Sequence, residues 1–147
     1  MFRFSTQQIT YEIGGVKIGG QPGENPPVLV GTIFYHKHKI VEDASKGIFN
    51  RVEAESLIKT VEELSDKTKL PFMLDVVGST PESIVKFIEF VANTTKTPIL
   101  VDTLGALEVS NAALKYVREV GLVDRVIYNS LTAKSKMKSL KFYRKIM

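Results

Sequence analysis

Three short apolar segments, each ending in an aspartate or an asparagine, recur along this chain at a constant spacing. Asp75, Asp102 and Asn129 end these segments and lie 27 residues apart, so that the three segments align without gaps. A parallel strand needs a crossover of roughly a dozen residues or more before the next one, usually a helix, and this spacing leaves room for it. The repeat therefore predicts β-α units in which the three polar residues meet at the carboxyl ends of neighbouring parallel strands.

The segments between these apolar runs have the periodicity of amphipathic helices. Asn50 is a suitable N-cap for a helix over 50–68, and Thr80-Pro81 begins a second helix, since proline lacks the N–H that the first turn leaves unpaired. A third helix is predicted over 107–120. The residues expected to be buried are Ala54, Leu57, Ile58, Val61 and Leu64 in the first helix, and Ile84, Val85, Ile88, Val91 and Ala92 in the second.

Four predicted strands alternate with these helices, over 28–35, 72–77, 99–102 and 125–129. The run 28–35 is almost continuously apolar, which is typical of a strand covered on both faces. Before it, two short alternating segments flank Gly14-Gly15, a pair that favours the turn of a β-hairpin. The order of a hairpin followed by β-α-β-α-β-α-β predicts an α/β fold with a parallel sheet and right-handed crossovers.

The three repeated polar residues are the candidate site. One interpretation is that Asp75, Asp102 and Asn129 only cap their own loops, as such residues often do. The other is that they share one rim and bind a ligand there. Two carboxylates beside an amide suit a ring that is rich in N–H groups, because the carboxylates accept hydrogen bonds and would repel phosphate. No residue is assigned as catalytic and no metal ligand is assigned.

Composition excludes several other classes of protein. The chain has no cysteine, so disulfide scaffolds, cysteine-ligated zinc and iron–sulfur clusters are ruled out. No apolar run approaches the ~20 residues of a membrane-spanning helix, so we expect no direct membrane insertion and a cytoplasmic location. The net charge of +4 arises in residues 134–147, which hold six of the 20 Lys and Arg residues and no acid. A nucleic-acid partner is therefore not expected.

His36 and His38 form the one pattern that suggests a metal. A His-x-His pair after the first strand is similar to that of metal-dependent amidohydrolase barrels, which gives an alternative function. These are the only histidines, however, and a catalytic zinc site needs about three protein ligands. An aspartate or glutamate would have to supply the third.

Five strings in order resemble a known family: GGQPGENP at 19–26, HKIVED at 38–43, ELSDKT at 63–68, MLDVVG at 73–78 and DRVIYNS at 124–130. The resemblance covers about residues 4–133. The chain resembles the H subunit of tetrahydromethanopterin S-methyltransferase, a family of methanogenic archaea.

The resemblance implies a methyltransferase that moves a methyl group from N5-methyl-tetrahydromethanopterin, its substrate, to the cob(I)amide of a corrinoid. The corrinoid is carried by a partner subunit of a membrane-associated complex, at which the family's proteins are peripheral and cytoplasmic, and no cofactor is bound covalently. The fold resembles the pterin-binding (β/α)₈ TIM barrels. Asp102 and Asn129 match residues that hold the pterin ring in those barrels, and Asp75 matches a carboxylate one strand earlier.

The length departs from the family's barrel, which needs about 250 residues, whereas this chain has 147. We expect a hairpin and loop over 1–27, the N-terminal half of a barrel over 28–133, and an aberrant basic tail over 134–147. A truncated chain of this kind is expected to be inactive alone. The alternative is a non-catalytic or split-barrel binding module, which pairs as a homodimer or with a companion half through its open edges.

Overall fold

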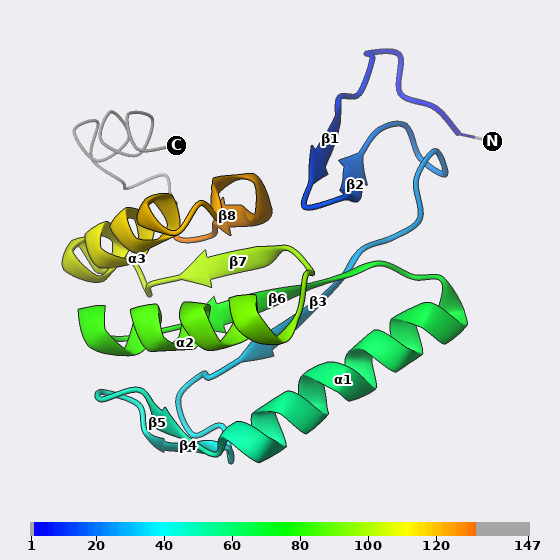
Figure 1. Ribbon diagram of the computed structural model, residues 1–147. Coiled ribbons are helices and arrows are strands. Elements are labelled where there is room, and N and C mark those ends of the chain that lie inside the picture. Colours follow the sequence, from blue (N-terminus) through cyan, green and yellow to red (C-terminus); the bar gives the residue numbers. More distant parts are fainter. Residues whose placement is uncertain (1, 132–147) are drawn as a thin grey trace.

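The computed structural model describes residues 2–131 (Figure 1). Its centre is a four-stranded parallel sheet in the order β3 (Leu29–Ile33), β6 (Phe72–Val77), β7 (Ile99–Asp102) and β8 (Val126–Tyr128). The four strands of this sheet lie side by side in the same order as they occur along the chain, so the strand order never reverses. The predicted mixed α/β fold with a parallel sheet is confirmed. The proposed tail over 134–147 lies outside the described residues.

Three helices connect the strands: α1 (Arg51–Thr68), α2 (Pro81–Thr94) and α3 (Leu107–Glu119). The predicted caps are present. The side chain of Asn50 accepts a hydrogen bond of 3.1 Å from the backbone N–H of Glu53. Thr80 and Ser83 bond each other's backbone N–H groups at the start of α2, at 3.1 Å in both directions. These bonds satisfy backbone donors that the first turn of a helix leaves unpaired. Within residues 2–131, no helix has both the length and the apolar composition needed to cross a membrane.

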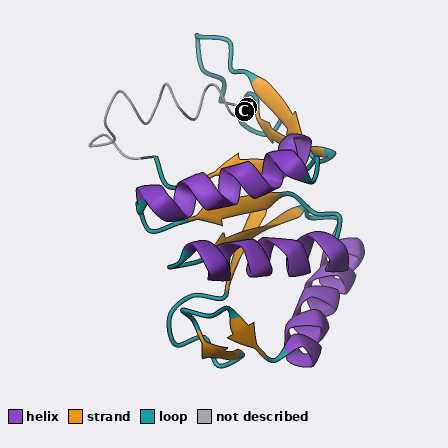
Figure 2. Ribbon diagram, turned by 60° about the vertical axis from the view of Figure 1, so that its left-hand side comes forward, coloured by secondary structure: helices purple, strands orange, loops and turns teal. Residues whose placement is uncertain are grey.

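Successive residues of β6 alternate between the two faces of the sheet, and this alternation separates the core from the candidate site. Phe72, Leu74 and Val76 belong to the hydrophobic cluster that the helices complete. Met73, Asp75 and Val77 point to the opposite face and are not part of that cluster. Figure 2 shows α2 and α3 side by side against the sheet.

The predicted buried face of α2 is confirmed, whereas that of α1 is only partly correct. Ile84, Ile88 and Val91 of α2 are fully buried. In α1, however, Leu57 and Leu64 are 40% and 54% exposed, against the prediction. The remaining predicted residues of these helices are buried or pack against the core: Ala54, Ile58, Val61, Val85 and Ala92.

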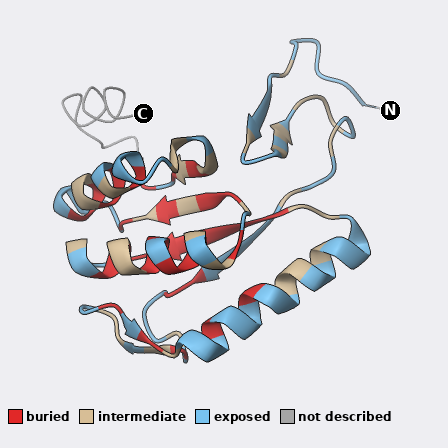
Figure 3. Ribbon diagram, viewed as in Figure 1, coloured by how far each residue is buried: buried red, intermediate tan, exposed pale blue. Residues whose placement is uncertain are grey.

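Strand β3 is shorter than the predicted 28–35 and is not covered on both faces. Leu29 and Val30 are 53% and 54% exposed. The physical reason is its position, since β3 is an edge strand of the four-stranded sheet and pairs only with β6 there. Figure 3 shows the same contrast, with β6 buried along its length and α1 largely exposed.

The predicted hairpin is formed by β1 (Thr10–Ile13) and β2 (Val16–Gly19). Gly14 and Gly15 occupy its turn with φ of +52° and +80°, as such turns require. The N–H of Gly14 donates to the carbonyl of Asp124 at 2.9 Å, just before β8. The hairpin is therefore attached to the amino-terminal end of the sheet, away from the carboxyl ends of the strands. A 3₁₀ turn, η1 (Val123–Arg125), leads into β8.

A second small ribbon was not predicted. Strands β4 (Val41–Asp43) and β5 (Ile48–Phe49) pair in antiparallel fashion between β3 and α1. Phe34, just after β3, has a φ of +66°, which is unusual for a bulky residue, and is 2% exposed. Its ring stacks on Phe87 with centroids 4.3 Å apart and planes 6° apart, and meets Phe49 edge-on at 4.7 Å. This aromatic cluster fixes the chain where it leaves the first strand of the sheet.

Candidate functional site

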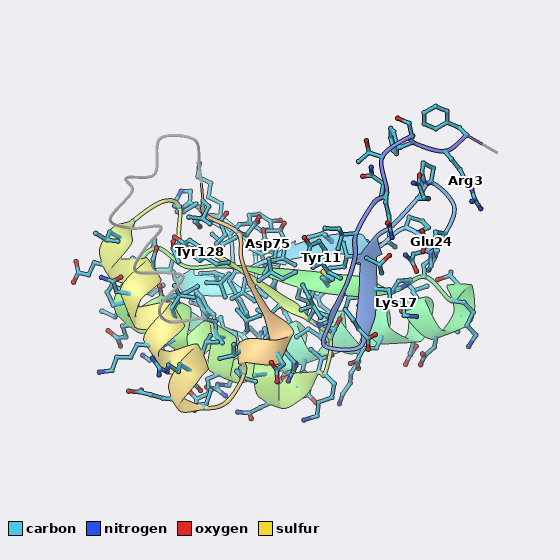
Figure 4. All side chains as sticks on the ribbon, turned by 90° about the horizontal axis from the view of Figure 1, so that it is seen from above. Arg3, Tyr11, Lys17, Glu24, Asp75 and Tyr128 are labelled. Carbon is cyan, nitrogen blue, oxygen red and sulfur yellow. The ribbon has the colours of Figure 1, made fainter. Side chains whose placement is uncertain are left out.

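The structure places all three predicted site residues on the face of the sheet opposite the helices. Asp75 alternates with the core residues of β6, and Asp102 follows Val101, which is fully buried in the core. Asn129 directly follows Tyr128, the last residue of β8, whose side chain belongs to the core cluster. Figure 4 labels Asp75 and Tyr128 over the sheet, far from Arg3 and Glu24 of the N-terminal segment. The prediction that these residues share one side of a parallel sheet is therefore consistent with the structure.

Asp75 and Asn129 are in direct contact although a strand separates them in the sheet. The amide nitrogen Nδ2 of Asn129 donates to Oδ1 of Asp75 at 3.1 Å. The hydroxyl of Thr32 donates to the other carboxylate oxygen of Asp75 at 3.4 Å. Both oxygens of this buried carboxylate therefore have a partner from another strand. Within residues 2–131, the Oδ1 of Asn129 and the second hydrogen of its Nδ2 have no partner.

The three residues do not lie at one level along the strands, as the 27-residue repeat alone suggests. The register pairs Asp75 with Leu100, so Asp102 lies two residues farther toward the carboxyl end, opposite Val77. Between β7 and β8 the register pairs Val101 with Tyr128, which places Asn129 beside Asp102. Asp75 is thus inside β6, whereas Asp102 and Asn129 are at the ends of their strands.

Asp102 is held at the start of the turn that follows β7. Its Oδ1 accepts a hydrogen bond of 2.8 Å from the N–H of Leu104 and one of 2.9 Å from the hydroxyl of Ser130. Leu104 has a φ of +53°, a conformation that non-glycine residues rarely adopt. The side chain of Asp102 therefore stabilises an unusual turn. The loop-capping interpretation is therefore correct for one oxygen of Asp102, and it does not account for the other.

A buried hydroxyl cluster behind Asp102 was missed by the sequence analysis. Thr103 and Ser110 are fully buried with their hydroxyl oxygens 2.7 Å apart, and the hydroxyl of Tyr128 lies 2.6 Å from that of Ser110. These residues connect the segment just after β7 with α3 and β8. The only signal for them in the sequence is the presence of hydroxyl residues within apolar stretches, which does not distinguish a network from isolated core residues.

Burial raises the pKa of Asp75 above its ordinary value of 3.8, and the negative charge of Asp102 acts in the same direction. Hydrogen bonds from Asn129 and Thr32 oppose this rise without cancelling it. The folded protein therefore binds the proton of Asp75 more tightly than the unfolded chain does. The stability that this proton provides is lost as the pH rises from about 3.8 through the raised pKa.

The variant Asp75→Asn is accordingly expected to be more stable than the wild type at neutral pH. The amide keeps an acceptor for Asn129 and removes the cost of a buried charge. In thermal unfolding measured between pH 4 and pH 8, the advantage of the variant should grow as the pH rises and then become constant.

Asp43 provides a control of opposite sign for this pH series. Hydrogen bonds from Ser45 and Lys46 hold its pKa below the ordinary value, so its contribution to stability is present above that value and disappears in acid. Asp43→Asn should therefore be less stable than the wild type at neutral pH. An advantage of Asp75→Asn that does not change with pH would contradict the assignment of the raised pKa to Asp75.

The two histidines do not assemble a metal site with other described residues. His36 is exposed, and His38 is half-buried with its ring edge-on to Tyr35 at 4.5 Å. Burial lowers the pKa of His38, and the charge of Lys39 adds to this effect. Within residues 2–131, no group of three or more His, Cys, Asp or Glu side chains is placed to hold a metal ion. The third ligand that the hydrolase alternative requires is therefore missing from this part of the chain.

Two shallow cavities lie at the opposite end of the sheet from the candidate rim. One, of about 400 Å³, lies between the hairpin, α1 and the loop before β7, and is lined in part by Gly14, Asp66 and Pro98. The other, of about 550 Å³, lies between the hairpin and η1, beside Asp124 and Arg125. The guanidinium of Arg125 donates to the carbonyls of Thr95 and Thr97 at 2.8 and 3.0 Å, which makes it a structural clamp.

Comparisons with known proteins agree with the resemblance seen in the sequence. The family model described as "Tetrahydromethanopterin S-methyltransferase MtrH subunit" matches residues 6–145. The tetrahydromethanopterin S-methyltransferase H subunit of Methanosarcina mazei is 50% identical over 133 residues, which cover 90% of this chain and 42% of that protein. The H subunit of the same enzyme from Methanopyrus kandleri is 52% identical over 127 residues, or 86% of this chain and 39% of that protein.

A third relative is the H subunit of another methyltransferase. The H subunit of the putative methyltransferase mtx from Methanosarcina acetivorans is 47% identical over 131 residues, or 89% of this chain and 42% of that protein. This chain thus spans about two-fifths of the length of the curated relatives that it matches. The match to the family model, in contrast, includes almost all of the chain, and the chain therefore belongs to the family of the tetrahydromethanopterin S-methyltransferase MtrH subunit.

Proposed function

We propose that this chain carries a pterin-binding surface of a methyltransferase, formed by Asp75, Asp102 and Asn129. The observation that supports this most is the set of hydrogen-bond acceptors on one face of the sheet. Within the described residues, Oδ1 of Asn129 has no hydrogen-bond partner and Asp102 uses only its Oδ1. A ring with adjacent amino and ring N–H groups, such as a pterin, offers the complementary donors.

The reaction that fits this surface is transfer of a methyl group from N5 of a methylated tetrahydropterin. The methyl leaves without the electron pair of the broken N–C bond, and N5 keeps that pair and takes up a proton. A corrinoid held by a partner subunit, as the family resemblance implies, would supply the electron pair for the new bond. The contribution of this chain is to bind and orient the pterin so that the methyl group faces its acceptor.

We infer that the sheet is the first half of a (β/α)₈ barrel. The strand order β3-β6-β7-β8 follows the chain, as in a barrel, and the site residues lie on the face without helices. At the edge strand β3, Leu29 and Val30 are exposed, as expected for a strand that lacks its neighbour from the other half. The relatives are more than twice as long as the matched region, so they have enough residues for the remaining strands. We therefore expect this chain to bind a pterin without completing methyl transfer alone.

The test is a titration of the purified chain with tetrahydromethanopterin, in which binding is measured by calorimetry and by the shift in thermal unfolding. Saturable binding is expected, and a ligand concentration of 100 times Kd should stabilise the fold by about 2.7 kcal/mol. Inorganic phosphate at the same concentrations is the control and should have no effect, because the site residues are carboxylates and an amide.

Light scattering of the same samples gives the size of the binding species. A monomer that binds the pterin would place the surface within this chain. Binding only by a dimer would mean that a second copy supplies the missing edge. If no concentration of tetrahydromethanopterin gives a binding heat or stabilises the fold, the proposal that this chain carries the surface is overturned.

A further inference from the structure

Ser130 lies at a junction between β7 and β8 that controls how Asp102 is oriented. The backbone N–H of Thr103 donates to the hydroxyl oxygen of Ser130 at 2.7 Å. The hydroxyl of Ser130 lies 2.9 Å from Oδ1 of Asp102 and donates to it. Because an amide N–H can only donate, the single proton of Ser130 is left for the carboxylate. The direction of this chain of hydrogen bonds is therefore fixed, from the backbone of Thr103 through Ser130 to Asp102.

The two oxygens of Asp102 have different environments. Oδ1 accepts from both Ser130 and the N–H of Leu104, at 2.9 and 2.8 Å. Among residues 2–131, no donor reaches Oδ2. Two donors on one oxygen hold the whole side chain of Asp102, since rotation about either of its two torsions would move Oδ1 away from both donors. The orientation of the second oxygen is thus determined by partners that it does not contact.

We propose that Ser130 is a positioning residue, which holds Asp102 so that its Oδ2 faces the ligand. This inference rests on the proposed function, because the ligand of Oδ2 is taken to be the amino and N–H edge of the pterin. Ser130 itself is 8% exposed, and its one proton is used within the protein. It therefore acts on the ligand through Asp102 and does not bind the ligand directly.

Ser110 offers a matched control, since it is another buried serine in the same region. Its hydroxyl contacts those of Thr103 and Tyr128, at 2.7 and 2.6 Å, and donates to the carbonyl of Ala106 at 2.8 Å. It makes no hydrogen bond with Asp102 in the described residues. Ser110→Ala and Ser130→Ala both remove a buried hydroxyl and should both lower stability. Only Ser130→Ala should change the orientation of the Asp102 side chain.

The first measurement needs no ligand. Three-bond couplings between the α and β protons of Asp102, measured by NMR on the full chain, report whether its Cα–Cβ torsion, the first of the two that place its oxygens, occupies one rotamer. The wild type and Ser110→Ala should give couplings of a single rotamer, and Ser130→Ala should give averaged values. Ser130→Thr retains the hydroxyl and should restore the single rotamer. Unchanged couplings in Ser130→Ala would overturn the inference, whatever the chain binds.

The second measurement is tetrahydromethanopterin affinity. Ser130→Ala should weaken binding roughly tenfold, which is the lower end of the effect seen when a partner that orients a metal ligand is removed. The same substitution made in an Asp102→Ala background should cause no further loss, because Ser130 would have nothing left to orient. Equal losses in both backgrounds would overturn the positioning role. A wild type that binds no pterin would overturn the proposed function instead, and the couplings would still decide the role of Ser130.

Discussion

Replacing Asp102 with asparagine is expected to weaken tetrahydromethanopterin binding by about 5- to 150-fold, which corresponds to the roughly 1–3 kcal/mol cost of leaving a buried donor unsatisfied. The substitution replaces the carboxylate oxygen Oδ2 with an amide NH2 group and leaves the rest of the side chain the same. The Oδ1 of an asparagine still accepts from Leu104 and Ser130, so the turn after β7 is retained. The outward atom becomes an amide nitrogen, a donor that faces the donors of the ligand. Calorimetric titration of the wild type and the variant measures the difference.

Asp66→Asn is the charge-matched control for this experiment. Asp66 is on α1 and lines the cavity at the opposite end of the sheet, so the same loss of charge should leave pterin affinity unchanged. Asp102→Ala provides a second comparison, because it also removes the acceptor for the N–H of Leu104 and should lower stability as well as affinity. If Asp102→Asn binds the pterin as tightly as the wild type, Asp102 does not contact the ligand.

Phe87→Ala is expected to lower the free energy of unfolding by about 3–5 kcal/mol, the largest loss of stability among the substitutions considered. The ring of Phe87 is 1% exposed and lies flat on Phe34, with centroids 4.3 Å apart, and edge-on to Phe49 at 5.5 Å. Its removal leaves a cavity and also frees Phe34, whose φ of +66° is tolerated only because the surrounding rings hold it. Urea denaturation followed by circular dichroism measures the change.

Phe4→Ala is the matched control, since it makes the same chemical change at a position that is 50% exposed. Its effect should stay within about 0.5 kcal/mol, as is usual for surface substitutions. A loss below about 1 kcal/mol for Phe87→Ala would mean that the core closes around the gap, which the stacked arrangement with Phe34 does not favour.

The elements that sequence predicted well are those with a local cause. The start of α1 at Asn50 and of α2 at Thr80 follows from side chains that bond the first turn, and no distant residue is needed. The buried strand β6 was predicted because a nearly continuous apolar run is typical of a parallel strand covered on both faces. The hairpin turn depends on two adjacent glycines.

The incorrect predictions concern burial that depends on distant neighbours. Leu57 and Leu64 have the spacing of a buried helix face, yet α1 buries mainly Ala54 and Ile58. Periodicity shows which residues share a face, but it does not show how wide a surface covers that face. Leu29, on the edge strand, is exposed for the same reason.

For the candidate site, the sequence indicated which residues share one face of the sheet, but not that Asp75 lies inside its strand or how the three contact one another. The contact of Asn129 with Asp75 depends on the register between strands, which a repeat in residue number does not determine. Ser130 was not singled out, although it follows Asn129 directly in the sequence. Its role depends on a backbone N–H and a carboxylate from another part of the sheet, and one serine after a strand carries no such information.

The stagger of two residues between Asp75 and Asp102 gives depth to the proposed pterin-binding surface. At about 3.3 Å per residue, the carboxylate of Asp75 originates roughly 6.6 Å below the level of Asp102 and Asn129. A flat ring that lay across the strand ends would meet the two upper residues and leave Asp75 untouched. A ring that stands upright, with one edge against the face of the sheet, can approach all three. Such a ring keeps its far edge above the sheet, where a reactive group would remain open to a second protein.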